Sequence, residues 1–449
     1  ARDRRVEIQN KMLEGAGHAD EVCLVCLTMN IAGEIKRTPM TRILFDRGIA
    51  EFESCGLDVI GSRVIDEATG SEAFWLVRGD AGKVKGQLEA VEDSFPAARL
   101  FDFDVLVTEE QTHTALKLSR KACRSCIVCG GPVTDCARSR RHGLDAVRTA
   151  TGGLLKEFCA GELAEAAYMS LLDELYTTPK PGLVDLANCG AHTDMDVPLF
   201  EKSAACLKPY FHEAALMGMD GCRMEELRMR GLTAEREMFK ITGGVNTHKG
   251  MIYSMGLLLA GTGRALSECG TCNTGSESCP DICIQNAAGY ALEDAEIMMA
   301  KSTDNPVTHG GNVMREYGAG GAMQEAASGF PDAVYCEERL NYYISELSAT
   351  DSGDTDKARR GKAGALAFCD CMARLEDTNL LHRGGPDGLD FARSKARQIS
   401  EMPDYENRIV ELREFDEEMI SRNLSPGGSA DMLALAFYIN RLRKITANV

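Results

Sequence analysis

The sequence predicts a multidomain chain, with an N-terminal α/β or α+β domain followed by a domain that is mostly α-helical. The length of 449 residues exceeds the roughly 250–300 residues at which a single hydrophobic core stops growing. Short apolar segments alternate with helical patterns up to residue 104, whereas long amphipathic stretches dominate after residue 153. The apolar fraction of 44% is sufficient to fill both cores.

The first domain, which we place at residues 1–150, is expected to combine strands and helices. Residues 22–31 and 98–107 predict strands, because β-branched or alternating apolar residues fill them. Residues 41–56 and 83–95 follow the 3.6-residue period of a helix. The segment 148–153 ends in two glycines ahead of a new helical pattern, which predicts the joint between the domains.

The second domain, residues 151–449, is expected to consist of helices joined by segments rich in glycine, proline, histidine and aspartate. Convincing strands are scarce there, and residues 348–364 have the composition of a polar loop. The amphipathic stretches are residues 154–176, 197–217, 233–240, 250–267, 284–301, 333–347, 358–375 and 405–421.

Charge and hydropathy limit the classes of partner. Residues 1–150 carry 21 basic and 23 acidic side chains, so most of the net charge of −18 lies in the second domain. That part would repel nucleic acid, and no basic motif with interleaved aromatics is present. The longest apolar run, residues 251–261, is shorter than the roughly 20 residues of a membrane span, and the first fifteen residues do not resemble a signal peptide. We therefore expect a cytoplasmic protein that binds neither nucleic acid nor membrane, with its 18 cysteines mostly as thiols.

Two features of the first domain point to phosphate chemistry. Asp102 and Asp104 are two residues apart in a predicted strand, so both carboxylates project from one face, about 7 Å apart. Such a pair can hold Mg²⁺ between the protein and a triphosphate, although two exposed strand acids are the simpler alternative. Residues 117–142 then carry one acid and seven basic side chains that would attract phosphate or an acidic partner: Lys117, Arg120, Lys121, Arg124, Arg138, Arg140 and Arg141.

Two cysteine clusters have the spacing of metal sites. The first, a C-x2-C-x6-C-x5-H pattern, can close a tetrahedral zinc site, with Cys123 as a competing ligand. The second lies between two predicted helices and suggests a small zinc loop. The alternative for the first cluster is a thiol-rich turn whose function lies in its arginines. The alternative for the second is an insertion in a cysteine-rich chain. The clusters are Cys126, Cys129, Cys136 and His142, and Cys269, Cys272, Cys279 and Cys283.

The segment TTPKPGLVDLANCGAHTDMD, residues 177–196, concentrates turn-forming and ionisable residues directly after a helical run. Residues 243–259, 305–331, 376–389 and 422–435 repeat this combination, and the last two include Asp377 and Asp431. One such segment alone predicts a capped helix end. Five together predict a metal-dependent polyphosphate or glycosyl site, since glycines let the backbone approach a ligand, carboxylates hold Mg²⁺ and basic residues balance phosphate.

The motifs TTPKPGLVD with GAHTDMD, GVNTHKG, EAASGFP, DTNLLHRGG and SPGGSADMLA closely resemble the triphosphoribosyl-dephospho-CoA synthase family, from about residue 155 onward. That family serves citrate lyase and, in a relative, malonate decarboxylase. LTMNIAGEIKRTP, RLFDFDVL and CARSRRH are similar to the citrate lyase holo-[acyl-carrier-protein] synthase, a nucleotidyltransferase-like phosphoribosyl-dephospho-CoA transferase. The resemblance implies a bifunctional fusion of two consecutive enzymes.

The resemblance implies that ATP and 3′-dephospho-CoA give 2′-(5″-triphosphoribosyl)-3′-dephospho-CoA and adenine in the second domain. It also implies that the first domain transfers the phosphoribosyl group to a serine of the citrate lyase acyl carrier protein and releases pyrophosphate. For the transfer, Asp102 and Asp104 would hold Mg²⁺, and Arg138, Arg140 and Arg141 would bind phosphate or the carrier. For the synthase, the expected base, metal and polar residues are Asp185, Asp194, Asp196, His192 and Glu325, with Mg²⁺ on Asp194 and Asp196. The expected ATP and phosphate residues are Lys180, Asn246, His248, Lys249, His309 and Arg383.

One departure from the family and two alternatives stay open. The family has an arginine and a glycine before the glutamate of the GFP segment, whereas this chain has Met323 and Gln324 before Glu325. If that arginine binds phosphate, another residue such as Arg315 must replace it. The alternatives are the equivalent malonate decarboxylase pathway and a zinc-stabilised scaffold that binds the carrier protein but has lost its activity.

Overall fold

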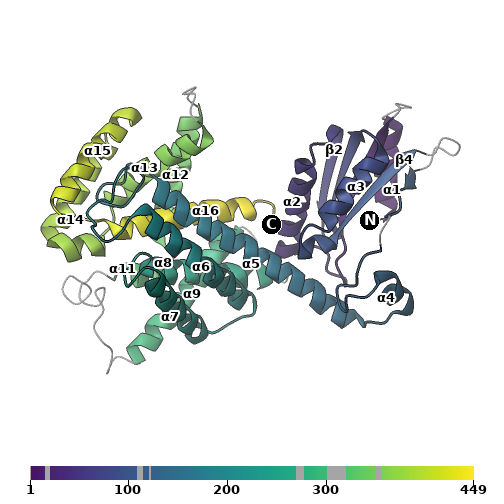
Figure 1. Ribbon diagram of the computed structural model, residues 1–449, viewed down its shortest axis with the longest axis horizontal. Coiled ribbons are helices and arrows are strands. Elements are labelled where there is room, and N and C mark those ends of the chain that lie inside the picture. Colours follow the sequence, from purple (N-terminus) through teal and green to yellow (C-terminus); the bar gives the residue numbers. More distant parts are fainter. Residues whose placement is uncertain are drawn as a thin grey trace. The chain divides into compact units, whose positions relative to one another are not determined.

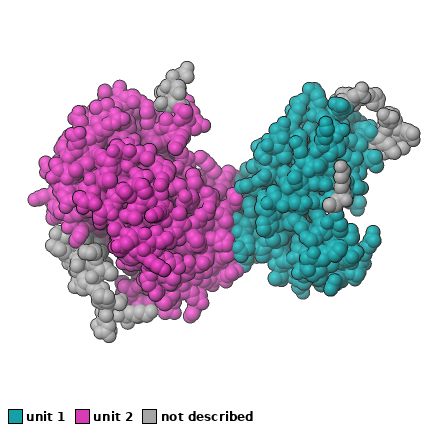
Figure 2. All heavy atoms as spheres, viewed as in Figure 1, with its two compact units in different colours: residues 1–159, 268–272, 448–449 teal, residues 160–267, 273–447 magenta. Residues whose placement is uncertain are grey.

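The structure is a computed structural model that describes residues 2–15, 21–108, 115–120, 123–268, 278–300, 320–349 and 355–449. The described chain forms two compact units (Figures 1 and 2). Unit 1 contains residues 1–159 with the short pieces 268–272 and 448–449, and unit 2 contains residues 160–267 and 273–447. Lys121, His309, Arg315, Cys269 and Cys272, which the sequence analysis singled out, lie outside the described residues.

Unit 1 is built on an antiparallel sheet with the strand order β2-β3-β1-β4-β5, so its class is α+β. The strands are β1 (Val22–Met29), β2 (Asp58–Glu67), β3 (Gly70–Arg78), β4 (Phe101–Thr108) and β5 (Ala115–Lys117). The helices are α1 (Arg2–Gly15), α2 (Pro39–Ser54), α3 (Ala81–Glu92), the short 3₁₀ helix η1 (Pro96–Leu100) and α4 (Val133–Ser139).

The two faces of this sheet carry different side chains because strand residues alternate. On one face, Val25, Phe103 and Trp75 pack against α2 and α3 in the main core of the unit. On the other face, Leu24 and Leu106 pack against α1. Strand β4 thus sends its phenylalanines into the main core and its even-numbered residues to the α1 face.

In the described part of unit 2, all elements of regular secondary structure are helices. Helix α5 (Leu144–Tyr176) begins in unit 1 and ends in unit 2, and the other helices follow in order. They are α6 (Val197–Met219), α7 (Met224–Ile241), α8 (Lys249–Glu268), α9 (Cys279–Ala300), α11 (Gly321–Ala327), α12 (Pro331–Ala349), α13 (Asp356–Met372), α14 (Thr378–Ser400), α15 (Tyr405–Ser421) and α16 (Gly427–Ile445). In the described residues, none of these helices is both long and apolar enough to cross a membrane.

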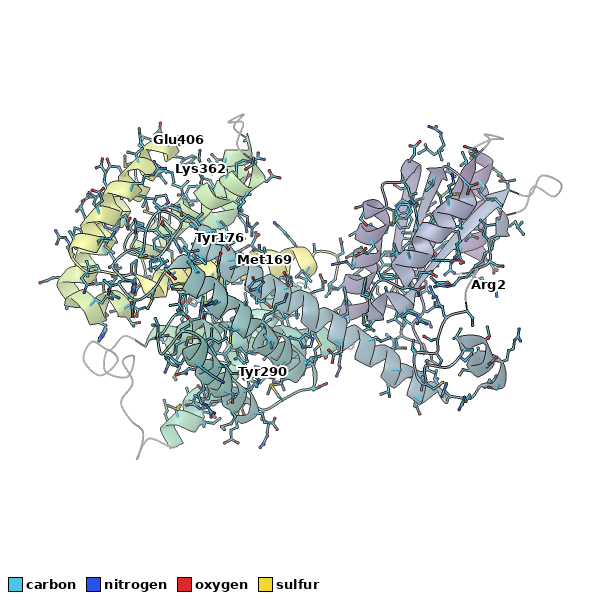
Figure 3. All side chains as sticks on the ribbon, viewed as in Figure 1. Arg2, Met169, Tyr176, Tyr290, Lys362 and Glu406 are labelled. Carbon is cyan, nitrogen blue, oxygen red and sulfur yellow. The ribbon has the colours of Figure 1, made fainter. Side chains whose placement is uncertain are left out.

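Helix α16 lies at the centre of unit 2. Its residues from Met432 to Asn440 are buried without interruption, which is typical of a helix surrounded by others. Its neighbours include α12, α13, α14 and α9. At the surface, the ion pair of Lys362 with Glu406 joins α13 to α15 at 2.7 Å (Figure 3).

Most of the expected elements agree with the structure, and the differences have physical causes. The strands expected at 22–31 and 98–107 are β1 and β4, and the helix expected from residue 154 starts ten residues earlier, at Leu144. The sequence analysis missed β2, an edge strand that is exposed along most of its length and so lacks an apolar period. It also missed α14, where Gly385 takes a non-helical φ of 60° and Pro386 follows.

Candidate active site

The segment 177–196 forms an ordered loop directly after α5, which we call the wall of the site. Asp185 is 3% exposed, and its carboxylate accepts hydrogen bonds from the backbone N–H groups of Lys180 (3.0 Å), Ala187 (2.7 Å) and Asn188 (3.2 Å). Asp416 of α15 accepts from the Gly182 N–H at 2.8 Å and from Asn188 Nδ2 at 2.7 Å. These bonds fix the loop, so the structure places Asp185 as an anchor of the wall.

Glycine is required at position 182 of this wall. Gly182 has a φ of 79°, in the region that L side chains rarely adopt, and a Cβ there would overlap the carbonyl oxygen of Leu424. The segment that contains Leu424 leads into α16, so the close approach brings two of the predicted motif segments together.

Lys180 lies inside this wall and forms a buried ion pair. It is 1% exposed, and its Nζ contacts Glu174 Oε1 in the last turn of α5. Burial raises the pKa of Glu174, the ammonium opposes that rise, and the nearby Asp185 adds to it. The Lys180 ammonium therefore pairs with Glu174, whereas Asp185 binds the Lys180 backbone N–H.

The N-termini of three helices meet beside this pair. Asp377 begins α14 and accepts from its Asn379 N–H at 2.9 Å, and the same carboxylate accepts from the Ser429 N–H of α16 at 2.7 Å. At the start of α8, a Cβ at Gly250 would overlap Oδ2 of Asp431, which belongs to α16. Each helix start carries a partial positive charge, which favours an anion at this position.

Asp431 is the carboxylate of this group that lacks compensation. Burial raises its pKa well above the ordinary range, and the neighbouring carboxylates of Glu174 and Asp377 raise it further. In the described chain, no hydrogen-bond donor reaches its carboxylate. Together, Glu174, Asp185, Asp377 and Asp431 form what we call the acidic cluster, with Lys180 as its buried cation.

His248 lies just before α8 and is neutral. Its Nδ1 lies 2.7 Å from Ser203 Oγ of α6, and the ring packs edge-on against Phe200. Burial, with the charge of Lys180, lowers the pKa of His248 to about 3. The ring therefore stays uncharged at neutral pH and serves the site as a hydrogen-bonding group.

His192, Arg383 and Ser425 form a second group on the same wall. His192 Nδ1 lies 3.2 Å from Arg383 Nη2, and its Nε2 lies 2.9 Å from Ser425 Oγ. A guanidinium can only donate, so Nδ1 accepts, Nε2 carries the proton, and the proton is donated to Ser425 Oγ. Burial, with the charge of Arg383, lowers the pKa of His192 and keeps this neutral form. The Ser425 hydroxyl is then free to donate to a ligand.

Several predicted site residues serve as helix caps or lie at the surface. Asp196 accepts from the Leu199 N–H and caps α6, and Glu325 accepts from the Asp332 and Ala333 N–H groups and caps α12. Asn246 accepts from the Lys249 N–H at the start of α8. Lys249 pairs with Glu235 at 2.7 Å and is exposed. Asp194 is exposed, and its Oδ1 lies 3.9 Å from His192 Nδ1.

The structure describes the position at which the sequence departs from the family. Met323 is partly buried in α11, two residues before Glu325. Arg374 pairs with Asp332 at 2.6 Å, and its charge lowers the pKa of Glu325 against a larger rise from burial. A guanidinium from a different part of the chain thus acts on Glu325.

In unit 1, Asp102 and Asp104 both project from the α1 face of β4, as the sequence predicted. They lie opposite Thr28 and Cys26 of β1, and Asp104 forms an ion pair with Lys117. Burial raises the pKa of Asp104, Lys117 opposes that rise, and the like charge of Asp102 adds to it.

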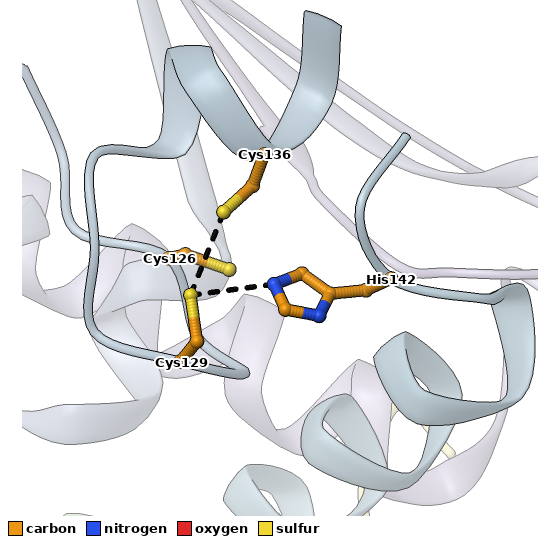
Figure 4. A group of neighbouring side chains, drawn as sticks. All are labelled: Cys126, Cys129, Cys136 and His142. Atoms are coloured by element: carbon orange, nitrogen blue, oxygen red, sulfur yellow. Dashed lines mark hydrogen bonds between the residues drawn. The ribbon is translucent and has the colours of Figure 1, made fainter. Parts of the chain in front are cut away.

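The basic segment 117–142 divides into internal and external parts. Arg120 and Arg124 both pair with Glu92, which is 2% exposed, and Lys117 pairs with Asp104. Their charges therefore stabilise the unit. Arg138, Arg140 and Arg141 are exposed and remain available to a partner. The structure also brings together Cys126, Cys129, Cys136 and His142 (Figure 4).

Sequence reasoning missed Glu174 and Asp416. Glu174 lies in the last turn of α5, where the helix dipole disfavours a negative charge. An acidic residue at that position could have indicated a nearby cation. Asp416 lies among other acids on α15 and has no local signal. Its role depends on the path of residues 182–188, more than 200 residues earlier.

Comparisons with known proteins match both units. Residues 160–449 match the family model described as ATP:dephospho-CoA triphosphoribosyl transferase, and residues 1–158 match apo-citrate lyase phosphoribosyl-dephospho-CoA transferase. Protein CitXG of Haemophilus influenzae is 30% identical, over 99% of this chain and 95% of its own. The 2-(5″-triphosphoribosyl)-3′-dephosphocoenzyme-A synthase of Haemophilus ducreyi is 34% identical over 69% of this chain and 98% of its own.

A solved structure, a putative triphosphoribosyl-dephospho-CoA synthase of Archaeoglobus fulgidus, is 14% identical. It covers 53% of this chain and 95% of its own at a TM-score of 0.34, which is too low to support a structural conclusion. The family models and the full-length relative, by contrast, account for both units. The chain belongs to the ATP:dephospho-CoA triphosphoribosyl transferase family, joined to an apo-citrate lyase transferase unit, and is a bifunctional transferase of citrate lyase prosthetic-group biosynthesis.

Proposed function

We propose that the acidic cluster of unit 2 is the site where the 2′-hydroxyl of 3′-dephospho-CoA attacks the ribosyl C1 of ATP. Adenine leaves with the electrons of the glycosidic bond, and the triphosphate stays on the ribose. The observation that carries this proposal is Lys180, a buried lysine held among carboxylates where the N-termini of α8, α14 and α16 meet. The match of residues 160–449 to the transferase family supports it.

The acidic cluster would bind Mg²⁺ through Asp431. Its donors are carboxylate oxygens, the hard ligands that Mg²⁺ prefers, and burial, with a smaller contribution from like charges, raises the pKa values of Glu174 and Asp431. Asp431, with no described donor, would hold the ion together with phosphate oxygens. Bound there, Mg²⁺ would neutralise triphosphate charge. The predicted ligands Asp194 and Asp196 remain a proposal for the outer part of the site, where Asp194 is exposed and Asp196 already caps α6.

The neutral residues bind and orient the substrates. The Ser425 hydroxyl, oriented by His192, donates to a phosphate or ribose oxygen, and Arg383 orients His192 from the other side. The developing charge on the ribosyl group is positive, so nearby carboxylates stabilise it. The hydroxyl proton passes to a carboxylate of the acidic cluster other than the one that holds the ion.

The test is release of adenine from ATP in the presence of 3′-dephospho-CoA and Mg²⁺. We expect Asp431→Asn to reduce that rate by about 100-fold or more. Asp390→Asn, which changes an exposed aspartate of α14, serves as the matched control and should keep the rate. An unaltered chain that releases no adenine with any divalent metal would overturn the proposal and favour a scaffold without activity.

We infer that unit 1 then transfers the phosphoribosyl-dephospho-CoA group to a serine of the citrate lyase acyl carrier protein. The serine oxygen bonds to the phosphorus next to the ribose, and pyrophosphate leaves. Asp102 and Asp104 would hold Mg²⁺ because their two carboxylates share one face of the strand, where Asp104 pairs with Lys117. Mass spectrometry of the carrier protein tests this step, with Asp104→Asn as the variant. Asp58→Asn, which removes one partner of an exposed ion pair with Arg78, is the control.

A further inference from the structure

The segment 123–142 of unit 1 has almost no apolar core of its own. Of its residues, only Cys126 and Cys136 are buried, and the rest are partly or fully exposed. A segment this short cannot be stabilised by hydrophobic burial, and small modules of this kind are usually held by disulfides or a metal. The structure records Cys123, Cys126, Cys129 and Cys136 as free thiols.

Four side chains converge at the centre of this segment (Figure 4). The Sγ atoms of Cys126, Cys129 and Cys136 and a ring nitrogen of His142 all lie within 4.8 Å of one another. Cys129 Sγ is 3.5 Å from Cys136 Sγ and 3.3 Å from His142 Nε2. Ligands at the usual zinc distances in a tetrahedron stand roughly 3.5–3.8 Å apart, so only small shifts of these atoms are needed.

The backbone is shaped to deliver these ligands. The Gly130 N–H donates to the Cys126 carbonyl at 2.8 Å, the Cys126 N–H donates to the Gly131 carbonyl at 2.6 Å, and Gly130 takes a φ of 73°. The Val128 N–H lies 3.4 Å from Cys126 Sγ and points to where a thiolate would carry its charge. Helix α4 then supplies Cys136, and a left-handed turn at Arg140 returns the chain to His142.

We propose that Cys126, Cys129, Cys136 and His142 bind one Zn²⁺ ion. Three thiolates and one imidazole are a complete tetrahedral set, so the ion has no open position and its role is structural. A disulfide would join only two of the four side chains and would leave the third thiol and the histidine without a purpose. The ion would join the two ends of the segment 123–142, which hydrophobic burial does not stabilise.

Zinc at this position also orders the three exposed arginines of the segment. Arg138 lies in the last turn of α4, and Arg140 and Arg141 lie between the third and fourth ligands. The five residues between Cys136 and His142 are thus fixed at both ends. This consequence, that the ion positions guanidinium groups for phosphate or carrier protein, rests on the proposed function of unit 1, whereas the metal site itself does not.

Metal content of the purified full-length chain is the first test. We expect about one zinc per chain, falling to near zero in Cys136→Ser. Cys123→Ser, which changes a cysteine three residues before Cys126 and outside the converging set, is the matched control and should keep the zinc. Cys279→Ser tests the second cysteine group. Zinc that persists in Cys136→Ser, or that is lost in Cys279→Ser alone, would overturn the assignment.

Cobalt provides a readout that does not depend on activity. A chain reconstituted with Co²⁺ alone should absorb in the visible range with a thiolate-to-cobalt charge-transfer band, and His142→Ala should change that spectrum. Should Cys136→Ser fail to fold, Cys136→His retains a zinc ligand and should keep both the metal and the fold. Tryptic cleavage after Arg138, Arg140 and Arg141 should rise on chelation and fall again when Zn²⁺ is added. Cleavage that ignores the metal would contradict the structural role.

Discussion

Replacing Lys180 with methionine tests whether the buried cation stabilises unit 2, acts in catalysis, or does both. Lys180 is 1% exposed and Glu174 is 8% exposed, so removing the ammonium leaves a buried carboxylate without its partner. Breaking a buried pair in this way costs about 3–5 kcal/mol. For a domain of this size that corresponds to a fall in Tm of roughly 6 to 15 °C.

The loss should depend on pH. The pKa of Glu174 is already raised in the folded chain, and without Lys180 it rises further. The folded state then binds more protons than the unfolded state, so the free energy of unfolding decreases as pH rises through the folded pKa. We therefore expect Lys180→Met to approach wild-type stability in acid and to be least stable at neutral and alkaline pH.

The double variant Lys180→Met/Glu174→Gln separates the two roles. It removes both charges, so most of the stability should return, whereas adenine release should stay reduced by about 100-fold because the site lacks its buried cation. Thermal unfolding and adenine release are measured on the same preparations. Wild-type adenine release in the double variant would refute a catalytic role for Lys180, and an unchanged Tm in the single variant would refute its burial.

Three further outcomes follow from the geometry. Gly250→Ala places a Cβ against Asp431 and should lower adenine release by about tenfold or more, whereas Gly289→Ala, with no neighbour near its Cβ, should leave it unchanged and slightly stabilise α9. His248 has a folded pKa of about 3, so its contribution to the free energy of unfolding is complete above pH 6.5 and is lost as the pH falls. His248→Gln lacks this titrating group. Between about pH 7 and about pH 5, denaturant titrations should therefore show a smaller loss of stability for the variant than for the wild type. Asp104→Asn should abolish the mass increase of the carrier protein and leave adenine release intact, and loss of both would contradict separate sites.

Much of the fold and of the candidate site could be predicted because local patterns determined them. The alternation of Asp102, Phe103 and Asp104 places the carboxylates on one face and the phenyl ring on the other, and the structure has that arrangement. The spacing of Cys126, Cys129, Cys136 and His142 likewise predicted a cluster that the fold assembles. In both cases the residues that act together lie within one short segment.

The remaining site could not be predicted because its contacts join distant segments. Asp416 holds the loop that contains Gly182, and Ser203 of α6 holds His248, yet neither has a neighbour in sequence that indicates this role. Local reasoning also could not tell a cap from a catalytic group. Asp196 and Glu325 lie in segments whose composition predicts a site, but both side chains cap helices in the structure.

Asp377 caps two helices at once, and this explains why two of the motif segments meet at helix junctions. One carboxylate oxygen caps α14 and the other accepts the Ser429 N–H and hydroxyl of α16, so a single side chain holds two helix starts together. Those starts lend partial positive charge, which compensates buried carboxylates before any cation binds and attracts a triphosphate afterwards. A residue that anchors both helices therefore also sets the electrostatic potential beside Asp431. Under the proposed function, this capping geometry would place the triphosphate next to the Asp431 carboxylate.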